Sequence, residues 1–427
     1  MFVMIKRCFC QRFSARVMLF RMMCVFVSMG SLWLSGCHDD DDPSNRKVNE
    51  AIYEEMRDLY LWYDELPAMG ELDLESDPED FFNSLLLDKD GKDGVHYSYI
   101  YKDGNSGFGK PAYLGFGMEY LLPSLQVSVV CRGAPAARAG ILRGDFIRAV
   151  GGVRVTADNI VEVLAPLVNE TKFTIGRWNE ETGREEELDI LVPGREMIYE
   201  DPVYLDTLYT ETRVGKVGYL AYGMFESGSD DQPELYNDEL KRIFVRFNSV
   251  GVKHLVLDLR RNAGGELTVC QLLCTMLAPR EAMGKVFLIG KYNDRNEDIV
   301  RLFDPEDMGE GAPLDIEKLI VIVDENSASA SELVIHCLKP YLGDKLLVVG
   351  TKTAGKNVGM DTRDILDSPW TIAPVQFYLL DCNGEYDYVD GLEPDVYIKD
   401  DFSGKVYSLG DRREPLLRKA MQVMGAE

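Results

Sequence analysis

Three serines separated only by alanines stand where a predicted strand meets a predicted helix. Ser327, Ser329 and Ser331 lie in segment 325–332 (ENSASASE), between the β-branched run 318–323 (KLIVIV) and apolar residues at helical spacing. A serine at a helix N-terminus can act as a nucleophile, because the helix dipole favours the negative charge that develops on its oxygen. It then needs a base to accept its proton. The same residues would also suit a plain helix cap with close packing.

A turn rich in glycine offers the amide groups that such a nucleophile requires. Asn262, Gly264 and Gly265 occur in segment 258–265 (DLRRNAGG), at the end of the apolar strand pattern 256–259. Two glycines leave backbone N–H groups unshielded, as an oxyanion hole requires. Asparagine and glycine also form ordinary turns, so this motif alone does not distinguish the two uses.

A lysine that could serve as the base follows the next strand pattern. Lys356 lies in segment 350–357 (GTKTAGKN), directly after the apolar run 346–349. A lysine can accept a proton where burial lowers its pKa, and serine–lysine dyads are a known variant of the catalytic triad. Lys352, in the same loop, is the rival base.

The same loop nearly satisfies the phosphate-binding P-loop pattern, which has two glycines separated by four residues and then a lysine. That use would make the chain a nucleotide-dependent enzyme. Asn357 stands where the pattern requires Ser or Thr to hold magnesium, and Gly359 and Asp361 follow where a helix should run. We therefore favour the lysine as a base.

Strands and helices alternate from about residue 214, which is typical of an α/β layer domain. Strands are predicted over 216–220, 256–259, 318–323 and 346–349, and helices over 235–247 and 267–277. All three polar turns therefore follow strands. Earlier in the chain, a stripe of apolar residues predicts a helix over 47–66, which Pro67 ends, and a short helix is expected over 81–87.

Residues 111–195 show a different pattern, with short strands, frequent turns and one predicted helix at about 158–167. The segments occur in the order 114–118 (LGFGM), 125–130 (LQVSVV), 133–141 (GAPAARAGI) and 142–152 (LRGDFIRAVGG). This order closely resembles a PDZ domain. The resemblance implies a groove in which a peptide C-terminus adds as a strand, with its carboxylate on backbone N–H groups. These groups would come from Leu114, Gly115, Phe116 and Gly117.

Together with that domain, the serine turn, the glycine turn, the GK loop and the tail motif 391–396 (GLEPDV) resemble the carboxyl-terminal processing, or tail-specific, serine protease family. The resemblance covers nearly all of the chain after residue 46. It implies a multidomain α/β protein with a crotonase-like (Clp-protease-like) protease core over 196–427. A β-barrel-like PDZ domain over 111–195 and an N-terminal helical region over 47–110 would precede that core.

The family pattern also implies roles for individual residues and a reaction. It gives the nucleophile as Ser329, the general base as Lys356, and the oxyanion donors as the N–H groups of Gly264 or Gly265 and of Ala330. The other two serines of the turn remain rival nucleophiles. The implied activity is that of an endopeptidase, which hydrolyses peptide bonds through an acyl-enzyme in proteins recognised by their exposed C-termini.

The sequence departs from the family pattern in three ways, and one of them is a slightly longer interval between Ser329 and Lys356. Met360 stands where the family has a glutamine that orients the lysine, and Lys339-Pro340 occupies the place of an aspartate near the end of the serine helix. Asn357 is a candidate substitute for the missing glutamine. The alternative hypothesis is therefore a catalytically weak or inactive lipoprotein of protease fold that acts as a peptide-binding module.

The first 36 residues predict an export signal. They hold five basic residues and no acidic one, and the apolar run 22–34 is too short to span a bilayer comfortably. The run ends at 34–37 (LSGC), which resembles a bacterial lipobox and implies lipidation of Cys37. The aspartates that follow suit an acidic tether over 37–46. We therefore expect a lipid-anchored protein of the bacterial cell envelope, on the periplasmic or surface face of the outer membrane.

Charge and composition argue against several kinds of binding partner and site. The net charge is −26 over 427 residues, which argues against nucleic acid as a partner. The five cysteines beyond Cys37 and the four histidines are scattered, so the sequence predicts neither a disulfide framework nor a metal site. The alternating aspartates at 88–94 lack the closing glutamate of a calcium loop. We expect no cofactor.

Overall fold

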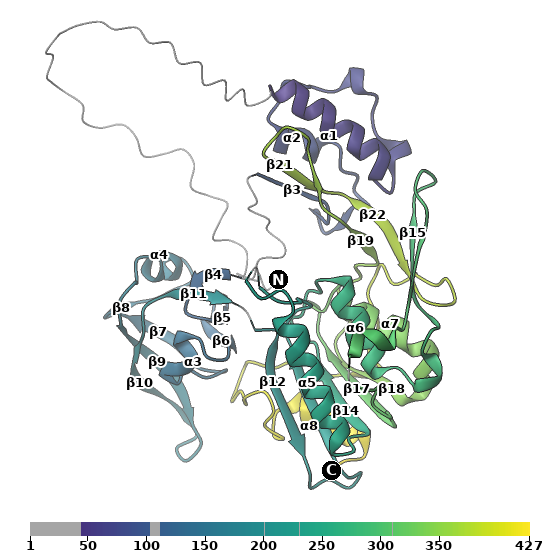
Figure 1. Ribbon diagram of the computed structural model, residues 1–427. Coiled ribbons are helices and arrows are strands. Elements are labelled where there is room, and N and C mark those ends of the chain that lie inside the picture. The colour runs from purple at the N-terminus through teal and green to yellow at the C-terminus, as the bar shows by residue number, and fades with distance from the viewer. Residues whose placement is uncertain (1–43, 103–111, 200, 230, 310) are drawn as a thin grey trace, which may run out of the picture.

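The structure of the protein is a computed structural model, and it describes residues 44–102, 112–199, 201–229, 231–309 and 311–427. Figure 1 shows three parts: an N-terminal part in purple, a PDZ part in blue, and an α/β core that carries the C-terminus. Within the described residues, no helix combines the length and apolar character needed to cross a bilayer. The predicted signal and Cys37 lie outside the described residues.

The core is built on a six-stranded sheet of order β12-β13-β14-β17-β18-β23. Its strands are Val203–Tyr209 (β12), Val217–Tyr222 (β13), His254–Asp258 (β14), Lys318–Val323 (β17), Leu346–Gly350 (β18) and Val396–Tyr397 (β23). β12 pairs antiparallel with β13, and every later pair in this order is parallel. The central strands are almost continuously apolar, as parallel strands covered on both faces require.

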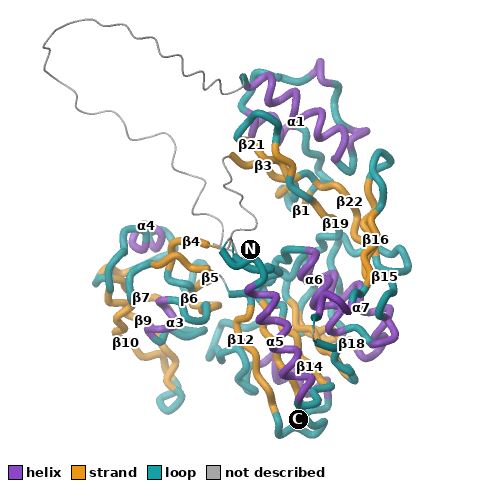
Figure 2. Tube along the Cα trace, viewed as in Figure 1, coloured by secondary structure: helices purple, strands orange, loops and turns teal. Residues whose placement is uncertain are grey.

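Helices cover both faces of this sheet, and Figure 2 draws those of the near face as purple tubes. One face carries α5 (Leu235–Ser249), α6 (Leu267–Leu277) and α7 (Ala330–Leu342), and the other carries α8 (Pro415–Met424). Successive side chains of β14 point to opposite faces of the sheet. Leu255 and Leu257 pack in the apolar cluster with α5, α6 and α7, and Val256 packs in the cluster with α8. The elements predicted for the core are confirmed to within a few residues.

The PDZ part has a sheet of order β10-β9-β7-β6-β5. Its strands are Met118–Leu121 (β5), Gln126–Val130 (β6), Phe146–Val150 (β7), Thr171–Asn179 (β9) and Arg184–Val192 (β10), with the short helices Pro135–Ala139 (α3) and Ile160–Leu164 (α4). The helix predicted over 158–167 is shorter than expected, since Pro166 cannot continue its hydrogen bonds. β4 (Ala112–Gly115) pairs with β11 (Glu196–Tyr199), so residues 196–199 pair with the PDZ part rather than with the core.

The helices of the N-terminal part all lie before residue 85. α1 (Asn45–Leu59) is shorter than the predicted helix, which extended to residue 66. It ends because Tyr60, which is fully buried, has an extended conformation. α2 (Pro78–Ser84) follows. β3 (Tyr99–Lys102) then pairs with β21 (Trp370–Ala373), which comes from the C-terminal third of the chain. The apolar cluster of this part likewise combines residues of α1 and α2 with Val358, Ile372 and Val375. It therefore shares its core with residues that follow the lysine loop.

A second sheet joins the N-terminal part to the core. Its order is β16-β15-β22-β19, with Val286–Tyr292 (β15), Ile299–Leu302 (β16), Val358–Met360 (β19) and Val375–Leu380 (β22). β19 begins two residues after Lys356. The candidate base is thus close in sequence to the sheet against which the N-terminal part packs.

Candidate active site

The three polar turns lie side by side because the strands before them are adjacent and parallel. β14, β17 and β18 are neighbours in the core sheet. At their carboxyl ends the chain enters the glycine turn, the serine turn and the lysine loop, respectively. Binding sites of open parallel sheets lie at this edge. The candidate nucleophile, base and amide donors therefore meet there, although they are far apart in the sequence.

Ser329 differs from the other two serines in conformation and exposure. It is the N-cap of α7, and its φ of 55° and ψ of −115° lie in a region that strongly favours glycine. The turn leaves Ser329 half-buried, at the edge of the sheet. Non-glycine residues held in such conformations cluster at functional sites, where the surrounding structure maintains the strain.

Ser327 and Ser331 are fully buried, and both hydroxyl groups already have acceptors. Ser327 Oγ donates to the carbonyl oxygen of Leu259 at 2.8 Å, and Ser331 Oγ donates to that of Asn262 at 2.8 Å. Both side chains therefore fasten the serine turn to the glycine turn. Of the three serines, Ser329 alone is placed to react with an external group.

The glycine turn packs directly on the serine. A β-carbon at Gly264 would lie 2.8 Å from Ser329 Cβ and 3.0 Å from the nitrogen of Ala330, so a larger residue would displace one of the turns. The Gly264 N–H donates to Asn262 Oδ1 at 2.9 Å and is therefore engaged within its own turn. For the N–H groups of Gly265 and Ala330, the described residues supply no acceptor.

The buried carboxylate of Glu332 joins the serine turn to the lysine loop. Its Oε2 accepts hydrogen bonds from the N–H groups of Ser329 and Lys356, each at 2.9 Å, so these nitrogens are separated by at most twice that distance. Its Oε1 accepts from the Gly355 N–H at 2.7 Å and from the Thr353 hydroxyl at 2.6 Å. Burial raises the pKa of this carboxyl, and the four hydrogen bonds counteract that rise only in part.

Lys356 and Lys352 have different surroundings. Lys356 is half-buried, and its Nζ lies over the ring of Tyr97 at 5.2 Å from the centroid. Lys352 Nζ instead pairs with Glu393 at 2.9 Å, and 43% of its side chain is exposed. After Lys356 the chain enters strand β19 rather than a helix. A P-loop needs a helix N-terminus to hold phosphate, so the nucleotide-binding alternative is wrong.

Asn357, the candidate partner of Lys356, and the residues at the two positions that depart from the family pattern are engaged elsewhere. Met360 packs against the apolar cluster of the N-terminal part. Asn357 is buried, and its Nδ2 donates to the carbonyl oxygen of Tyr386 at 2.8 Å. Lys339 Nζ donates to a core carbonyl oxygen at 2.9 Å, at the end of α7.

Glu332 and Tyr97 surround the lysine and were not among the predicted site residues. Glu332 had a local signal, because Ser329 and Glu332 have the spacing of a capping box, in which the acid accepts a hydrogen bond from the N-cap N–H. Tyr97 had no such signal. It comes from the N-terminal part and reaches Lys356 only through the tertiary fold.

Of the predicted carboxylate-binding residues of the PDZ part, Leu114 and Gly115 end β4, and Phe116 and Gly117 lie between β4 and β5. Leu114 is 48% exposed, whereas Phe116 is buried with its ring edge-on to Phe173, at 5.3 Å between centroids. The carbonyl groups of Phe116 and Gly117 accept bonds from the PDZ backbone, but their own N–H groups find no acceptor in the described parts of the chain. Gly115 pairs with β11. β5 is the last strand of its sheet, so one of its edges is unpaired among the described residues.

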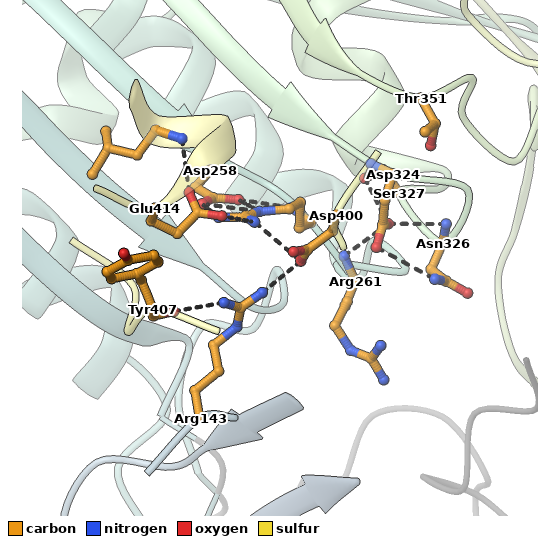
Figure 3. A network of polar contacts seen from close by, with 12 residues as sticks. Arg143, Asp258, Arg261, Asp324, Asn326, Ser327, Thr351, Asp400, Tyr407 and Glu414 are labelled. Carbon is orange, nitrogen blue, oxygen red and sulfur yellow. Dashed lines mark hydrogen bonds and ion pairs between the residues drawn. The ribbon is translucent and has the colours of Figure 1, made fainter. Parts of the chain in front are cut away.

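Ion pairs hold the PDZ part against the core, as Figure 3 shows. Arg143 of the PDZ part donates to Asp400 at 2.6 Å, and Arg260 donates to the same oxygen at 3.1 Å. Arg260 is buried between Asp258 and Glu414, and these acids bind its guanidinium at 2.6 and 2.9 Å. The PDZ part is thereby tied to the strand that leads into the glycine turn.

A second pair connects the glycine turn to β5, the edge strand of the PDZ sheet. Arg261, within that turn, pairs with Glu119 of β5 at 3.1 Å, and both side chains are largely buried. The Arg261 N–H donates to Asp324 Oδ1 at 2.9 Å, at the start of the serine turn. Arg261 thus connects the glycine turn, to which it belongs, with both the PDZ sheet and the start of the serine turn.

Comparison with known protein families agrees with the three parts of the chain. The model of "Peptidase family S41" matches residues 216–398. The model of "Peptidase S41 N-terminal domain" matches residues 47–99, and that of "PDZ domain" matches residues 126–175. The first match contains the serine turn, the glycine turn and the lysine loop.

Individual proteins give the same result. A protein of Staphylococcus aureus named a probable CtpA-like serine protease is 28% identical over 342 residues, and the match covers 74% of this chain but only 61% of that relative. A crystal structure from Bacteroides fragilis described as an S41 protease is 28% identical with a TM-score of 0.75, covering 87% of this chain and 96% of that one. The photosystem II D1 C-terminal processing protease shares the fold, with a TM-score of 0.50 at 17% identity and coverage of 90% and 98%. The chain therefore belongs to peptidase family S41, with the N-terminal domain of that family and a PDZ domain.

Proposed function

We propose that the protein is a serine endopeptidase in which Ser329 is the nucleophile and Lys356 the general base. Lys356 Nζ takes the hydroxyl proton as Ser329 Oγ bonds to the carbonyl carbon of the substrate. The resulting ammonium then protonates the departing amine as the peptide C–N bond breaks. Water hydrolyses the acyl-enzyme that remains on Ser329, with the lysine again accepting a proton.

Backbone amides at the junction of the two turns stabilise the oxyanion in this proposal. The N–H groups of Gly265 and Ala330 have no acceptor among the described residues, whereas the Gly264 N–H is engaged with Asn262. We therefore assign the oxyanion contacts to Gly265 and Ala330. Ala330 opens α7, so the helix dipole also favours negative charge at this place.

The observation that carries the proposal is the shared contact of Glu332. A single carboxylate oxygen accepts hydrogen bonds from the backbone N–H groups of Ser329 and Lys356. A fully buried group that binds the backbone of both residues at once holds the two segments in one arrangement. A serine and a lysine that merely shared a surface would need no such group.

The PDZ part supports a preference for exposed C-termini. The N–H groups of Phe116 and Gly117, which have no acceptor among the described residues, suit a carboxylate, and the edge of β5 along which no described strand pairs suits an added peptide strand. Glu119 of β5 is paired with Arg261 of the glycine turn, so a peptide held on this strand lies near the proposed oxyanion site. We therefore propose protein substrates that are delivered by their C-termini.

The location in the cell is a separate proposal. The basic and apolar residues before the Leu34-Ser35-Gly36-Cys37 motif support an exported protein that is lipidated at Cys37 and anchored to the outer membrane. Metabolic labelling with an alkyne fatty acid tests this. Labelling of the native protein and its loss in Cys37→Ala is expected, and equal labelling of both would refute the anchor.

A fluorophosphonate probe and a set of unfolded protein substrates test the proposed activity. The native protein should form one adduct and cleave the substrates, and Ser329→Ala should do neither. Lys356→Met should fold normally but lose nearly all reactivity. A native protein that binds C-terminal peptides, yet forms no adduct and cleaves nothing, would replace the protease proposal with that of a peptide-binding module.

A further inference from the structure

We propose that Tyr97, from the N-terminal part, is a positioning residue for the reaction, and that its ring face stabilises Lys356 when this lysine becomes charged. The proposal rests on the proposed function, because it assumes that Lys356 accepts a proton from Ser329. It assigns to the N-terminal part a direct share in the active site.

The geometry places the ring of Tyr97 against the ammonium group. Lys356 Nζ lies over this ring at 5.2 Å from its centroid, which is within the range of favourable cation–π contacts. The backbone of Tyr97 is held in turn by Asp90: the Tyr97 N–H donates to the Asp90 carbonyl oxygen at 2.8 Å and to Asp90 Oδ1 at 3.2 Å. Asp90 is fully buried and also accepts the N–H of Ser98 at 3.0 Å. The backbone that carries the ring is therefore held by a buried carboxylate.

Directly before Tyr97, β2 (Val95–His96) pairs antiparallel with β1 (Gly91–Lys92), and this hairpin holds the lysine loop at a second point. Lys92, at the end of β1 (Gly91–Lys92), donates from Nζ to the carbonyl oxygen of Ala354 at 2.7 Å and to that of Asp390 at 3.5 Å. Ala354 lies two residues before Lys356. The N-terminal part therefore contacts the lysine loop at two points. Lys92 binds the backbone of the loop, and Tyr97 contacts the side chain of Lys356.

An aromatic face contributes most when the lysine carries charge. The ring favours an ammonium over a neutral amine, and Lys356 becomes an ammonium as it takes the proton of Ser329. Burial, and then the negative charge of Glu332, raises the pKa of Tyr97 to about 12, so Tyr97 stays a neutral phenol at neutral pH. The face thus acts on the transition state more than on the resting enzyme.

The departure at Met360 is consistent with this arrangement. Met360 ends β19 and packs into the apolar cluster of the N-terminal part, and Tyr97 borders the same cluster. The position that holds the orienting glutamine in the family here helps to fix the N-terminal part against the core. That part then supplies Tyr97 as the neighbour of the lysine.

The test compares Tyr97→Leu with Tyr97→Phe by the rate at which a fluorophosphonate modifies Ser329 between pH 5 and pH 10. The labelling rate should rise with pH along an acid limb, as Lys356 loses its proton, and then reach a plateau. In Tyr97→Leu we expect the plateau rate to fall roughly threefold to tenfold and the acid limb of this pH–rate profile to move to lower pH by up to about one unit. The limb moves down because loss of the face favours the neutral amine. Tyr97→Phe retains a ring face and should keep both the limb and most of the rate. If Tyr97→Leu does not fold, pentafluorophenylalanine at position 97 keeps the shape, reverses the charge of the face and should move the limb in the same direction.

Tyr101→Leu is the matched control, because Tyr101 is a half-buried tyrosine of the same part on β3, where it stacks on Tyr99. The acid limb of the pH–rate profile of Tyr101→Leu should stay at the pH of the native protein. An unmoved limb in Tyr97→Leu, or equal effects of Tyr97→Leu and Tyr97→Phe, would overturn the inference while leaving the protease intact. Labelling that persists in Ser329→Ala would instead refute the proposed function itself.

Discussion

Replacement of Glu332 by glutamine changes one oxygen of a buried carboxylate into an amide nitrogen. In the native protein, four donors point at its two oxygens: the N–H groups of Ser329, Gly355 and Lys356 and the hydroxyl of Thr353. A glutamine keeps one oxygen, which accepts two of these bonds, and turns an NH₂ group towards the other two donors. Either orientation of the amide therefore loosens one side of the junction.

The size of the effect follows from these bonds. Each hydrogen bond to a charged group contributes about 1.5–3 kcal/mol, so two lost bonds amount to roughly 3–6 kcal/mol. Burial raises the pKa of the Glu332 carboxyl, so removal of its charge relieves a desolvation cost and offsets part of this loss. We expect the free energy of unfolding to fall by about 2–4 kcal/mol. A displacement of Lys356 or Ser329 by about 1 Å would slow the reaction roughly hundredfold.

Urea unfolding and the rate of fluorophosphonate labelling measure the two effects separately. Glu325→Gln is the control, because Glu325 is exposed on the same turn and accepts one bond, from Thr351 at 3.1 Å. We expect this control to stay within about 0.5 kcal/mol of the native stability and to label normally.

Two results would count against this role for Glu332. Native stability together with a native labelling rate in Glu332→Gln would mean that the carboxylate does not hold the two segments. A loss of stability with an unchanged labelling rate would restrict Glu332 to a structural role away from the dyad.

Further predictions concern the turns and the contact between the parts. Ser329→Gly should raise the free energy of unfolding by about 1 kcal/mol, because it relieves the positive φ, and should abolish labelling. Ser331→Ala should cost about 1 kcal/mol in urea unfolding, yet keep the adduct on Ser329, as seen by peptide mapping. Gly265→Ala should lower peptide hydrolysis roughly hundredfold, since its β-carbon would lie 2.1 Å from the Phe225 carbonyl oxygen; unchanged kcat would refute the assignment of this amide. Burial raises the pKa of Asp400, but the charges of Arg260 and Arg143 outweigh it and the net shift is downward. This carboxylate therefore stabilises the fold above the ordinary carboxyl pKa, and the contribution is lost as the pH falls through the lowered value. Urea unfolding at pH 6 and pH 3 should show a smaller loss in Asp400→Asn than in the native protein.

The core was predictable because its strands and helices have distinct local patterns. The β-branched run of β17 and the helical spacing of α7 predicted the strand, turn and helix around Ser329 to within a few residues. The N-terminal part was less predictable. Its strand β3 pairs with β21, from the other end of the chain, and no local pattern announces that pairing. Its expected helix to residue 66 also ended at Leu59, where tertiary burial of Tyr60 prevails over helical spacing.

The candidate site shows the same division. Ser329, Lys356 and the two glycines follow adjacent strands, so motif and topology together bring them to one edge. The distinction between Gly264 and Gly265 required the actual hydrogen bond of the Gly264 N–H to Asn262. The dismissal of Ser327 and Ser331 likewise required their burial and their acceptors. Tyr97 depends on packing between parts of the chain that are distant in sequence, which local patterns do not encode.

Mapping of the fluorophosphonate adduct by peptide mass spectrometry tests the central claim most directly. A single adduct on Ser329 of the native protein, which disappears in Lys356→Met but persists in Lys352→Met, is the predicted result. An adduct on Ser327 or Ser331, or labelling that depends on Lys352 rather than Lys356, would contradict the assignment of the dyad.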